Sequence, residues 1–249
     1  MSLLETENLH KTFGDLVAVD SVDLAVEAGT VHSVIGPNGA GKSTLFDLVT
    51  GLHEPTGGRV RFDGEDITGW SPYRIARRGV ARSFQTSDVF GGLEVGENVR
   101  IAAQAADDRR DSPFSRVGGL GDVAERARSV LTDVGLAEYR NSPARDLGHG
   151  DRRKLEIALT VVNDPTLLLL DEPTAGVGKG DAIEMIEMIR RVAAEREVTI
   201  VMIEHDIEMV MNTSDTVTVL QNGRVIAEGP PEAVSDDAEV QRAYLGVTG

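Results

Sequence analysis

A glycine-rich segment at residues 36–44 has the residue types and spacing that bind phosphate. Its sequence, GPNGAGKST, matches the pattern G-x-x-x-x-G-K-[ST] at every fixed position. Glycines let successive backbone N–H groups point at phosphate oxygens, and a helix that begins near Lys42 adds its positive N-terminal dipole. Lys42 supplies a positive charge to the β- and γ-phosphates, and the Ser43 hydroxyl can coordinate Mg²⁺. The predicted nucleotide-binding residues are Gly36, Pro37, Asn38, Gly39, Ala40, Gly41, Lys42, Ser43 and Thr44.

Two carboxylates follow an apolar run at residues 167–170, in the sequence LLLLDEP. A buried strand that ends in acidic residues presents metal and water ligands at the ligand-binding edge of an α/β sheet. We expect Asp171 to hold Mg²⁺, through water, and Glu172 to polarise the water that attacks the nucleotide.

The hydrophobic pattern predicts an α/β fold with an insertion. Alternating apolar residues at 3–9 and 17–26 predict N-terminal antiparallel strands, and the run at 30–35 predicts a buried strand before the phosphate-binding segment. Further strands are expected at 167–170, 198–203, 217–221 and 224–227. A helix at about 180–195 lies between the first two of these, which is typical of a parallel sheet.

Between residues 72 and 163 the pattern is mainly helical, with apolar residues three and four positions apart at 93–106, 122–135 and 151–163. The polar segment 107–121 is expected to be an exposed loop. We therefore expect a single nucleotide-binding domain over 1–249, with a helical subdomain at about 86–162 inserted in the core.

Composition limits the classes of function. The 249 residues include 41 acidic and 25 basic ones, for a formal net charge of −16, which argues against nucleic acid as the main partner. The absence of cysteine excludes a disulfide framework and a cysteine nucleophile. We find no signal peptide and no apolar segment near the ~20 residues of a membrane helix, so we expect a cytosolic protein that reaches a membrane through protein partners. Few lysines among many acids suggest a salt-rich cytoplasm, with a GC-rich genome as the alternative.

These motifs resemble the ATP-binding subunits of ATP-binding cassette (ABC) transporters over nearly the whole chain. The resemblance implies that Phe13 stacks on adenine, for which the π face of a phenylalanine suffices. It also implies that Gln85 reaches Mg²⁺ and senses the membrane partner, and that His205 contacts the γ-phosphate. Glu172, His205 and Gln85 are the implied catalytic residues, and Ser43, Gln85 and Asp171 the metal ligands.

The chain departs from the family at two segments. The signature sequence LSGGQ appears as LGHGD at 147–151, so that Gly148 and Gly150 contribute backbone to the partner's nucleotide while the serine hydroxyl is lost. The expected SALD appears as AGVG at 175–178, without the aspartate that crosses the dimer. These departures place the nucleotide site formed by this chain's signature segment in question, and leave the site of its own phosphate loop intact.

The segment RSFQ at 82–85, the polar insertion and the ending RAYLG resemble ATPases of branched-chain amino-acid importers, whose relatives import urea and short amides. The resemblance implies a homologous ATPase partner, as a heterodimer or homodimer, two permease subunits and a solute-binding protein. Two alternatives remain: an ABC ATPase outside import, and a regulatory subunit that binds ATP and hydrolyses little. A role in DNA repair or translation is disfavoured by the negative charge and the single cassette.

Overall fold

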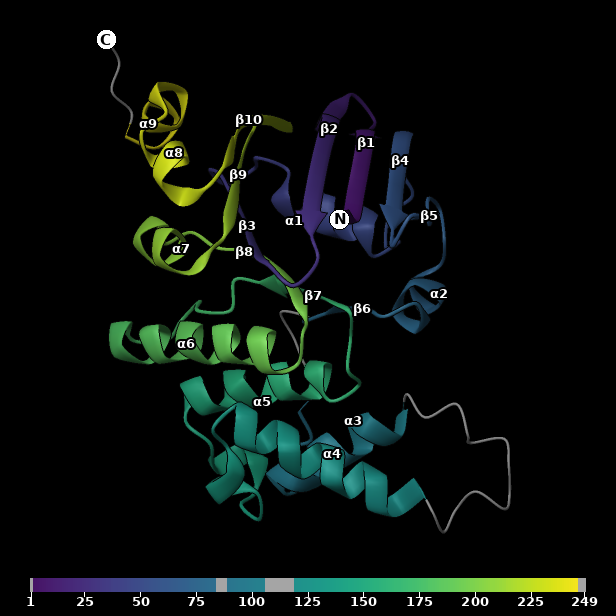
Figure 1. The fold of residues 1–249 in the computed structure, drawn as a ribbon, viewed down its shortest axis with the longest axis vertical. Helices are drawn as coiled ribbons and strands as arrows, with labels where there is room; N and C mark the ends of the chain where they lie inside the picture. The colour runs from purple at the N-terminus through teal and green to yellow at the C-terminus, as the bar shows by residue number, and fades with distance from the viewer. Residues whose placement is uncertain (1, 84–88, 106–118, 246–249) are drawn as a thin grey trace. The chain divides into compact units, whose positions relative to one another are not determined.

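The structure is a computed structural model that describes residues 2–83, 89–105 and 119–245. It divides into two compact units (Figure 1). The first unit comprises Met1–Arg82, Thr166–Pro173 and Glu197–Gly249, and the second comprises Ser83–Pro165 and Thr174–Arg196.

The first unit contains a four-stranded antiparallel sheet in the order β2-β1-β4-β5. Its strands are β1 (Ser2–Phe13), β2 (Leu16–Glu27), β4 (Gly57–Phe62) and β5 (Glu65–Asp66). The turn between β1 and β2 contains Gly14 at a φ of +59°, a conformation that glycine adopts without steric cost. This sheet confirms the expected N-terminal antiparallel element.

The second sheet of this unit has six strands in the order β10-β9-β3-β8-β7-β6. Its strands are β3 (Val31–Ile35), β6 (Val80–Arg82), β7 (Leu167–Asp171), β8 (Thr199–Ile203), β9 (Thr216–Gln221) and β10 (Arg224–Gly229). The pairs from β6 to β9 are parallel, and β10 is antiparallel to β9. The β-branched and leucine-rich strands β3, β7 and β8 are buried at every position, as expected for the centre of a parallel sheet.

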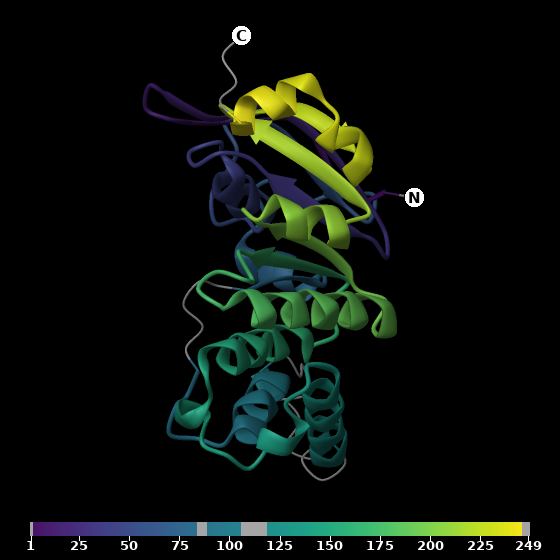
Figure 2. The same cartoon turned by 90° about the vertical axis from the view of Figure 1, so that its left-hand side faces the viewer.

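Helices cover both faces of the six-stranded sheet. In sequence order they are α1 (Lys42–Val49), α2 (Pro72–Arg77), α7 (Ile207–Thr213), α8 (Pro231–Ser235) and α9 (Ala238–Leu245). The apolar side chains of α1 belong to one core that includes residues of both sheets. A second core joins β3 and β9 to α7, α8 and α9, which lie together in the yellow and yellow-green part of Figures 1 and 2.

The second unit is helical. Its helices are α3 (Val95–Ala105), α4 (Gly119–Asp133), α5 (His149–Val161) and α6 (Lys179–Glu195), with single 3₁₀ turns at Ala137–Tyr139 and Ala144–Asp146. Arg196, just after α6, donates to Asp133 and Asp164 at 2.7 and 2.8 Å. This half-buried guanidinium connects the end of α6 by hydrogen bonds to the end of α4 and to the loop after α5.

The α/β fold class is confirmed, with one correction to the elements. Residues 80–82, inside the segment expected to be helical, form the edge strand β6, paired in parallel with β7. Three residues are too few for a periodic signal, so the strand is determined by its pairing partner. Of the expected loop at 107–121, residues 107–118 lie outside the described part of the chain. Residues 119–121 are helical, because α4 begins at Gly119. Among the helices that the structure describes, none is both long and apolar enough to span a membrane.

Candidate nucleotide-binding site

The glycine-rich segment forms a tight loop between β3 and α1. A Cβ atom on Gly36 would lie 2.1 Å from the carbonyl oxygen of Leu220, and one on Gly41 would lie 2.3 Å from that of Ala18. Gly41, at a φ of 102°, precedes α1 and has no side chain with which to cap it. The first N–H groups of α1 are therefore available to an anion. Asn38, Gly39 and Ser43 are exposed, and Pro37 and Thr44 are half-buried.

Lys42 is folded back over this loop. Its buried ammonium group donates to the carbonyl oxygens of Gly36 and Pro37 at 2.7 and 3.1 Å. Burial lowers the pKa of Lys42, and the negative charges of Glu172 and Asp171 oppose that shift. The lysine and the two carboxylates therefore share one electrostatic environment.

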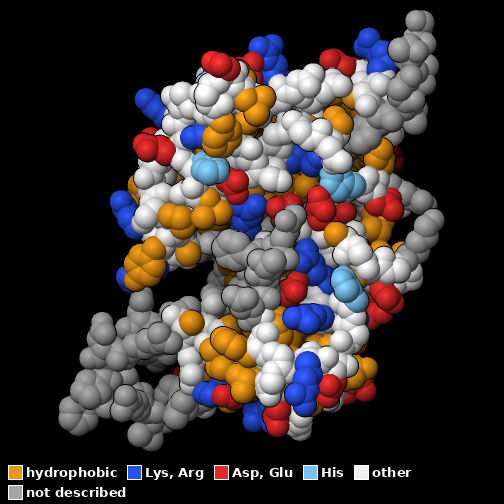
Figure 3. All heavy atoms as spheres, turned by 180° about the vertical axis from the view of Figure 1, so that it is seen from behind, with side chains coloured by type: hydrophobic (Ala, Val, Ile, Leu, Met, Phe, Trp, Pro, Cys, Tyr) orange, Lys and Arg blue, Asp and Glu red, His pale blue; other side chains and the backbone are white. Residues whose placement is uncertain are grey.

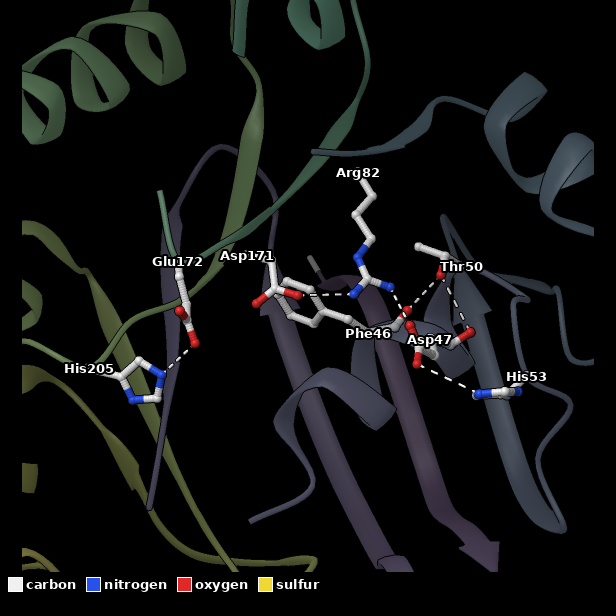
Figure 4. A network of polar contacts seen from close by, with 8 residues as sticks. All are labelled: Phe46, Asp47, Thr50, His53, Arg82, Asp171, Glu172 and His205. Atoms are coloured by element: carbon white, nitrogen blue, oxygen red, sulfur yellow. Dashed lines mark hydrogen bonds and ion pairs between the residues drawn. The ribbon is translucent and has the colours of Figure 1, made fainter. Parts of the chain in front are cut away.

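Asp171 and Glu172 lie where β7 ends, beside the end of β8. Asp171 is the last residue of β7 and is paired with Ile203, while the backbone N–H of Glu172 donates to the Ile203 carbonyl at 2.9 Å. Glu172 has a φ of +49°, a left-handed conformation that few non-glycine residues adopt. This turn separates the directions of two adjacent carboxylates (Figure 4).

His205 and Glu172 point toward each other (Figure 4). The Nε2 atom of His205 lies 2.5 Å from Oε1 of Glu172, and both side chains remain partly exposed. The sequence placed both residues in the site from separate strand ends, and the structure brings them into direct contact. A carboxylate accepts this hydrogen bond, so the imidazole donates from Nε2 when Glu172 is ionised.

Arg82 is a site residue in the segment RSFQ, and the sequence alone assigns it no role. Its guanidinium donates to Asp171 Oδ2 at 3.0 Å and to Asp47 Oδ1 at 2.5 Å. Asp47, in α1, was not identified from the sequence at all. The signal available in the sequence was weak: an arginine three positions before Gln85.

The donor chemistry of the site fits Mg²⁺ bound together with nucleotide phosphates. Ser43 offers an exposed hydroxyl and Asp171 a carboxylate, which are oxygen ligands of the kind that Mg²⁺ takes. Among the described residues no group of three or more His, Cys, Asp or Glu side chains could hold a metal ion. Mg²⁺ in nucleotide sites takes one or two protein ligands together with the phosphates of the substrate, and Ser43 and Asp171 fit that number of ligands.

Phe13 lies at the end of β1 with 42% of its surface exposed. The His53 ring meets it edge-on, with ring centroids 5.2 Å apart, and the Lys11 ammonium lies 5.0 Å from the ring centroid. The remaining exposed surface is available for stacking on an aromatic base, which is the role the resemblance implies.

The remaining predicted residues are Gln85, Gly148 and Gly150. Gln85 falls outside the described residues. Gly148 and Gly150 are in the second unit, where Gly148 precedes the first residue of α5. In place of the serine of the family signature, Gly148 supplies backbone alone. His149 packs near Gly176, since a Cβ atom on that glycine would lie 3.3 Å from Cε1 of the imidazole.

A phosphate loop followed by a strand that ends in two carboxylates defines a nucleotide-binding domain, and comparison with known families assigns its class. The profile of the ABC transporter family matches residues 19–175, and a profile named for branched-chain amino acid ATP-binding cassette transporters matches residues 224–248. This chain belongs to the ABC transporter ATP-binding family.

Several curated relatives align with nearly the whole chain. The high-affinity branched-chain amino acid transport ATP-binding protein BraF of Pseudomonas aeruginosa is 39% identical, with 98% of each chain covered. LivG of Escherichia coli, which has the same descriptive name, is 37% identical, also with 98% of each chain covered. A probable LivG of Archaeoglobus fulgidus is 35% identical over 99% of this chain and 96% of its own.

Solved structures agree with the fold. The ADP conformation of MJ1267, an ATP-binding cassette of an ABC transporter, has a TM-score of 0.87 at 32% identity and covers 99% of both chains. A nucleotide-free ATP-binding cassette from an ABC transporter has a TM-score of 0.84 at 31% identity, with 98% of this chain and 99% of that one covered.

Proposed function

We propose that this chain binds and hydrolyses ATP to power an importer of branched-chain amino acids or of a related small polar solute such as urea. The observation that carries the proposal is the cluster in the first unit: a complete phosphate loop, a lysine influenced by the charges of Asp171 and Glu172, and a histidine bonded to Glu172. The names of BraF and LivG support the choice of solute class.

In this proposal each side chain acts on the nucleotide in a separate way. Phe13 stacks on adenine, and Lys42 with the loop N–H groups binds the β- and γ-phosphates. Ser43, Asp171 and Gln85 hold Mg²⁺, which neutralises phosphate charge when bound. Glu172 orients and polarises the attacking water, and His205 fixes the carboxylate through its 2.5 Å hydrogen bond and meets the γ-phosphate.

The chain acts as one member of an assembly at the cytoplasmic face of the membrane. A homologous ATPase subunit pairs with it head to tail, two permease subunits bind the pair, and a solute-binding protein delivers the solute. A heterodimer is favoured because the segment at 147–151 lacks the signature serine, so a partner with an intact signature would complete the better site, on this chain's Lys42 and Glu172.

Reconstituted uptake tests the solute class. The chain, its ATPase partner, both permeases and the solute-binding protein are placed in liposomes, and uptake of labelled leucine and of labelled urea is measured. We expect ATP-dependent uptake of one of them, which Lys42→Ala abolishes because the phosphates lose their fixed positive charge. ATP hydrolysis that neither solute stimulates in the intact assembly contradicts import of leucine and urea and favours an ABC ATPase outside import.

The second candidate is a regulatory subunit that binds ATP with little hydrolysis. It is favoured by Gly148, which supplies no hydroxyl at the start of α5, and by Gly178 in place of an aspartate. Steady-state ATP hydrolysis in the complete assembly separates the two candidates, because a regulatory subunit leaves turnover unchanged when its own Glu172 is replaced.

A further inference from the structure

Three charged side chains form a row beside the phosphate loop: Asp171, Arg82 and Asp47. They come from the ends of the neighbouring strands β7 and β6 and from α1. Arg82 Nη2 lies 3.0 Å from Asp171 Oδ2, and Arg82 Nη1 lies 2.5 Å from Asp47 Oδ1 (Figure 4). One guanidinium therefore bridges two carboxylates, with a separate nitrogen for each.

The row is largely removed from solvent at the Asp171 end. The Asp171 side chain is 5% exposed and that of Arg82 is 11% exposed, whereas Asp47 is 25% exposed. The Arg82 guanidinium also lies 5.6 Å from the ring centroid of Phe46 in the core. The planar Arg82 guanidinium is hydrogen-bonded through two nitrogens and lies beside the Phe46 ring, so it has few alternative orientations. It therefore fixes the orientation of the Asp171 carboxylate.

The charges of the row do not cancel. A guanidinium alone beside Asp171 would neutralise that carboxylate and repel a divalent cation. Asp47 supplies a second negative charge on the far nitrogen, so that the three groups together carry one net negative charge. That charge is equal to the charge of an ionised Asp171 by itself.

We propose that Arg82 is a positioning residue that fixes Asp171 for Mg²⁺, and that Asp47 is required to compensate the charge of Arg82. The proposal rests on the proposed function, because it assigns Asp171 to the metal of an ATP complex. In ordinary metal sites, loss of a group that orients a ligand reduces metal affinity about 10–100-fold. Replacement of either Arg82 or Asp47 should therefore weaken metal binding, while the phosphate loop keeps its affinity for nucleotide.

The test measures two affinities of the full chain. A fluorescent ATP analogue is titrated in EDTA, and Mn²⁺, as a spectroscopic probe for Mg²⁺, is titrated into the stoichiometric ATP complex and followed by electron paramagnetic resonance. We expect Arg82→Met to keep the nucleotide affinity in EDTA within about twofold and to weaken Mn²⁺ binding about 10–100-fold. Arg82→Lys keeps the positive charge without the planar guanidinium, so its Mn²⁺ affinity should fall less than that of Arg82→Met.

Asp47→Asn separates charge from position. It leaves Arg82 in place with an uncompensated charge, so Mn²⁺ binding should weaken although Asp171 keeps its guanidinium. The double variant Asp47→Asn/Arg82→Met restores the net charge of the row but leaves Asp171 without its guanidinium, so it should bind Mn²⁺ no more tightly than Arg82→Met. If Arg82→Met fails to fold, Arg82→Lys and Asp47→Asn still give the comparison.

Arg78 provides a matched control in the same unit. It also bridges two carboxylates, those of Asp63 and Glu65 at 3.0 and 3.1 Å, and lies 5.9 Å from the Phe62 ring centroid. Arg78→Met should leave Mn²⁺ binding unchanged. Unchanged or tighter Mn²⁺ binding in Arg82→Met, or an equal loss in Arg78→Met, overturns the proposal. Failure of the wild-type chain to bind the nucleotide in EDTA overturns the proposed function instead.

Discussion

At the scale of single residues, Glu172 and Lys42 adopt states that are energetically unfavourable in isolation. Glu172 keeps a left-handed backbone conformation at a φ of +49°, and its N–H is bonded to Ile203 of the adjacent strand. Such a conformation costs of order 1–3 kcal/mol and persists where the surrounding structure fixes it. Lys42 keeps its ammonium buried against carbonyl oxygens and near two carboxylates. Both features indicate a site organised before its ligand arrives.

The tight approach at Gly36 leads to a prediction about one methyl group. Gly36→Ala would place a Cβ 2.1 Å from a backbone oxygen of β9, which cannot move without disturbing the sheet. We expect a loss of at least about 2 kcal/mol in the free energy of unfolding, together with weaker ATP binding. Denaturant unfolding monitored by circular dichroism measures the first effect.

Gly14→Ala is the control for this substitution, because Gly14 has a φ of +59° and no atom within 4 Å of the added Cβ among the described residues. Its cost should be limited to the left-handed conformation, about 1–2 kcal/mol. Equal stability of the two variants contradicts the close packing of the phosphate loop on β9.

At the scale of elements, the site exists because separate strand ends meet. β7 and β8 are parallel neighbours, so Glu172 and His205, 33 positions apart, follow the same edge of one sheet. In the second unit, the start of α5 and the loop before α6 meet at His149 and Gly176. The two departures from the family sequence therefore lie close together, with the imidazole of His149 opposite a residue that has no side chain.

A double-mutant cycle tests whether these departures compensate each other. Gly176→Ala has a backbone cost because Gly176 has a φ of +77°, and an additional cost from the imidazole 3.3 Å away. In the His149→Ala background only the backbone cost should remain, so the coupling free energy should be at least about 0.5 kcal/mol. Thermal unfolding of the four proteins gives this coupling, and additive effects would show that the two positions are independent.

Strand β3 contains a histidine whose burial makes stability depend on pH. Burial lowers the pKa of His32 from 6.5 to about 4, and its Nε2 lies 2.7 Å from Thr218 Oγ1, which donates to Glu228. The unfolded chain therefore binds a proton more readily than the folded one between pH 6.5 and 4. This histidine should lower the free energy of unfolding by about 2 kcal/mol between pH 7 and pH 5.

Urea unfolding at pH 7, 6 and 5 measures this effect. His32→Gln removes the titrating group while its amide can still bond Thr218, so its stability should fall less over the same range. A variant with the same pH slope as the wild type would exclude His32 as the source.

Much of this arrangement could be predicted from the sequence, because local patterns encode it. The loop at 36–44 predicts a helix start with phosphate-binding groups. The leucine run before Asp171 predicts a buried strand that ends in two carboxylates. Arg82 and Asp47 could not be predicted, because their role depends on pairing of the three-residue strand β6 and on the packing of α1 against it. The contact of His205 with Glu172 likewise depends on strand register, which no local pattern specifies.

At the scale of the whole molecule, the formal net charge is −16. On the face shown in Figure 3, red acidic and blue basic side chains are interspersed. ATP is itself a polyanion, and in the proposed function the chain binds it with one lysine, backbone N–H groups and a helix start. Bulk charge therefore bears on the solvent around the protein more than on the nucleotide site.

Salt should stabilise this surface. Potassium chloride screens repulsion among the excess carboxylates, so the melting temperature should rise by several degrees between about 0.1 and 2 M KCl. Scanning calorimetry measures it, with sucrose of equal osmolarity as the control for solvent exclusion. A melting temperature that KCl does not change contradicts adaptation to a salt-rich cytoplasm.

The central claim is that Glu172, held by His205, carries the hydrolysis that drives the assembly. The most direct test is the steady-state rate of ATP hydrolysis by the complete assembly with Glu172→Gln in this chain alone. Loss of one polarising carboxylate should reduce turnover about 10²-fold or more while ATP binding persists, and the paired ATPases should remain closed on ATP. Equal rates for the wild type and Glu172→Gln would contradict the account.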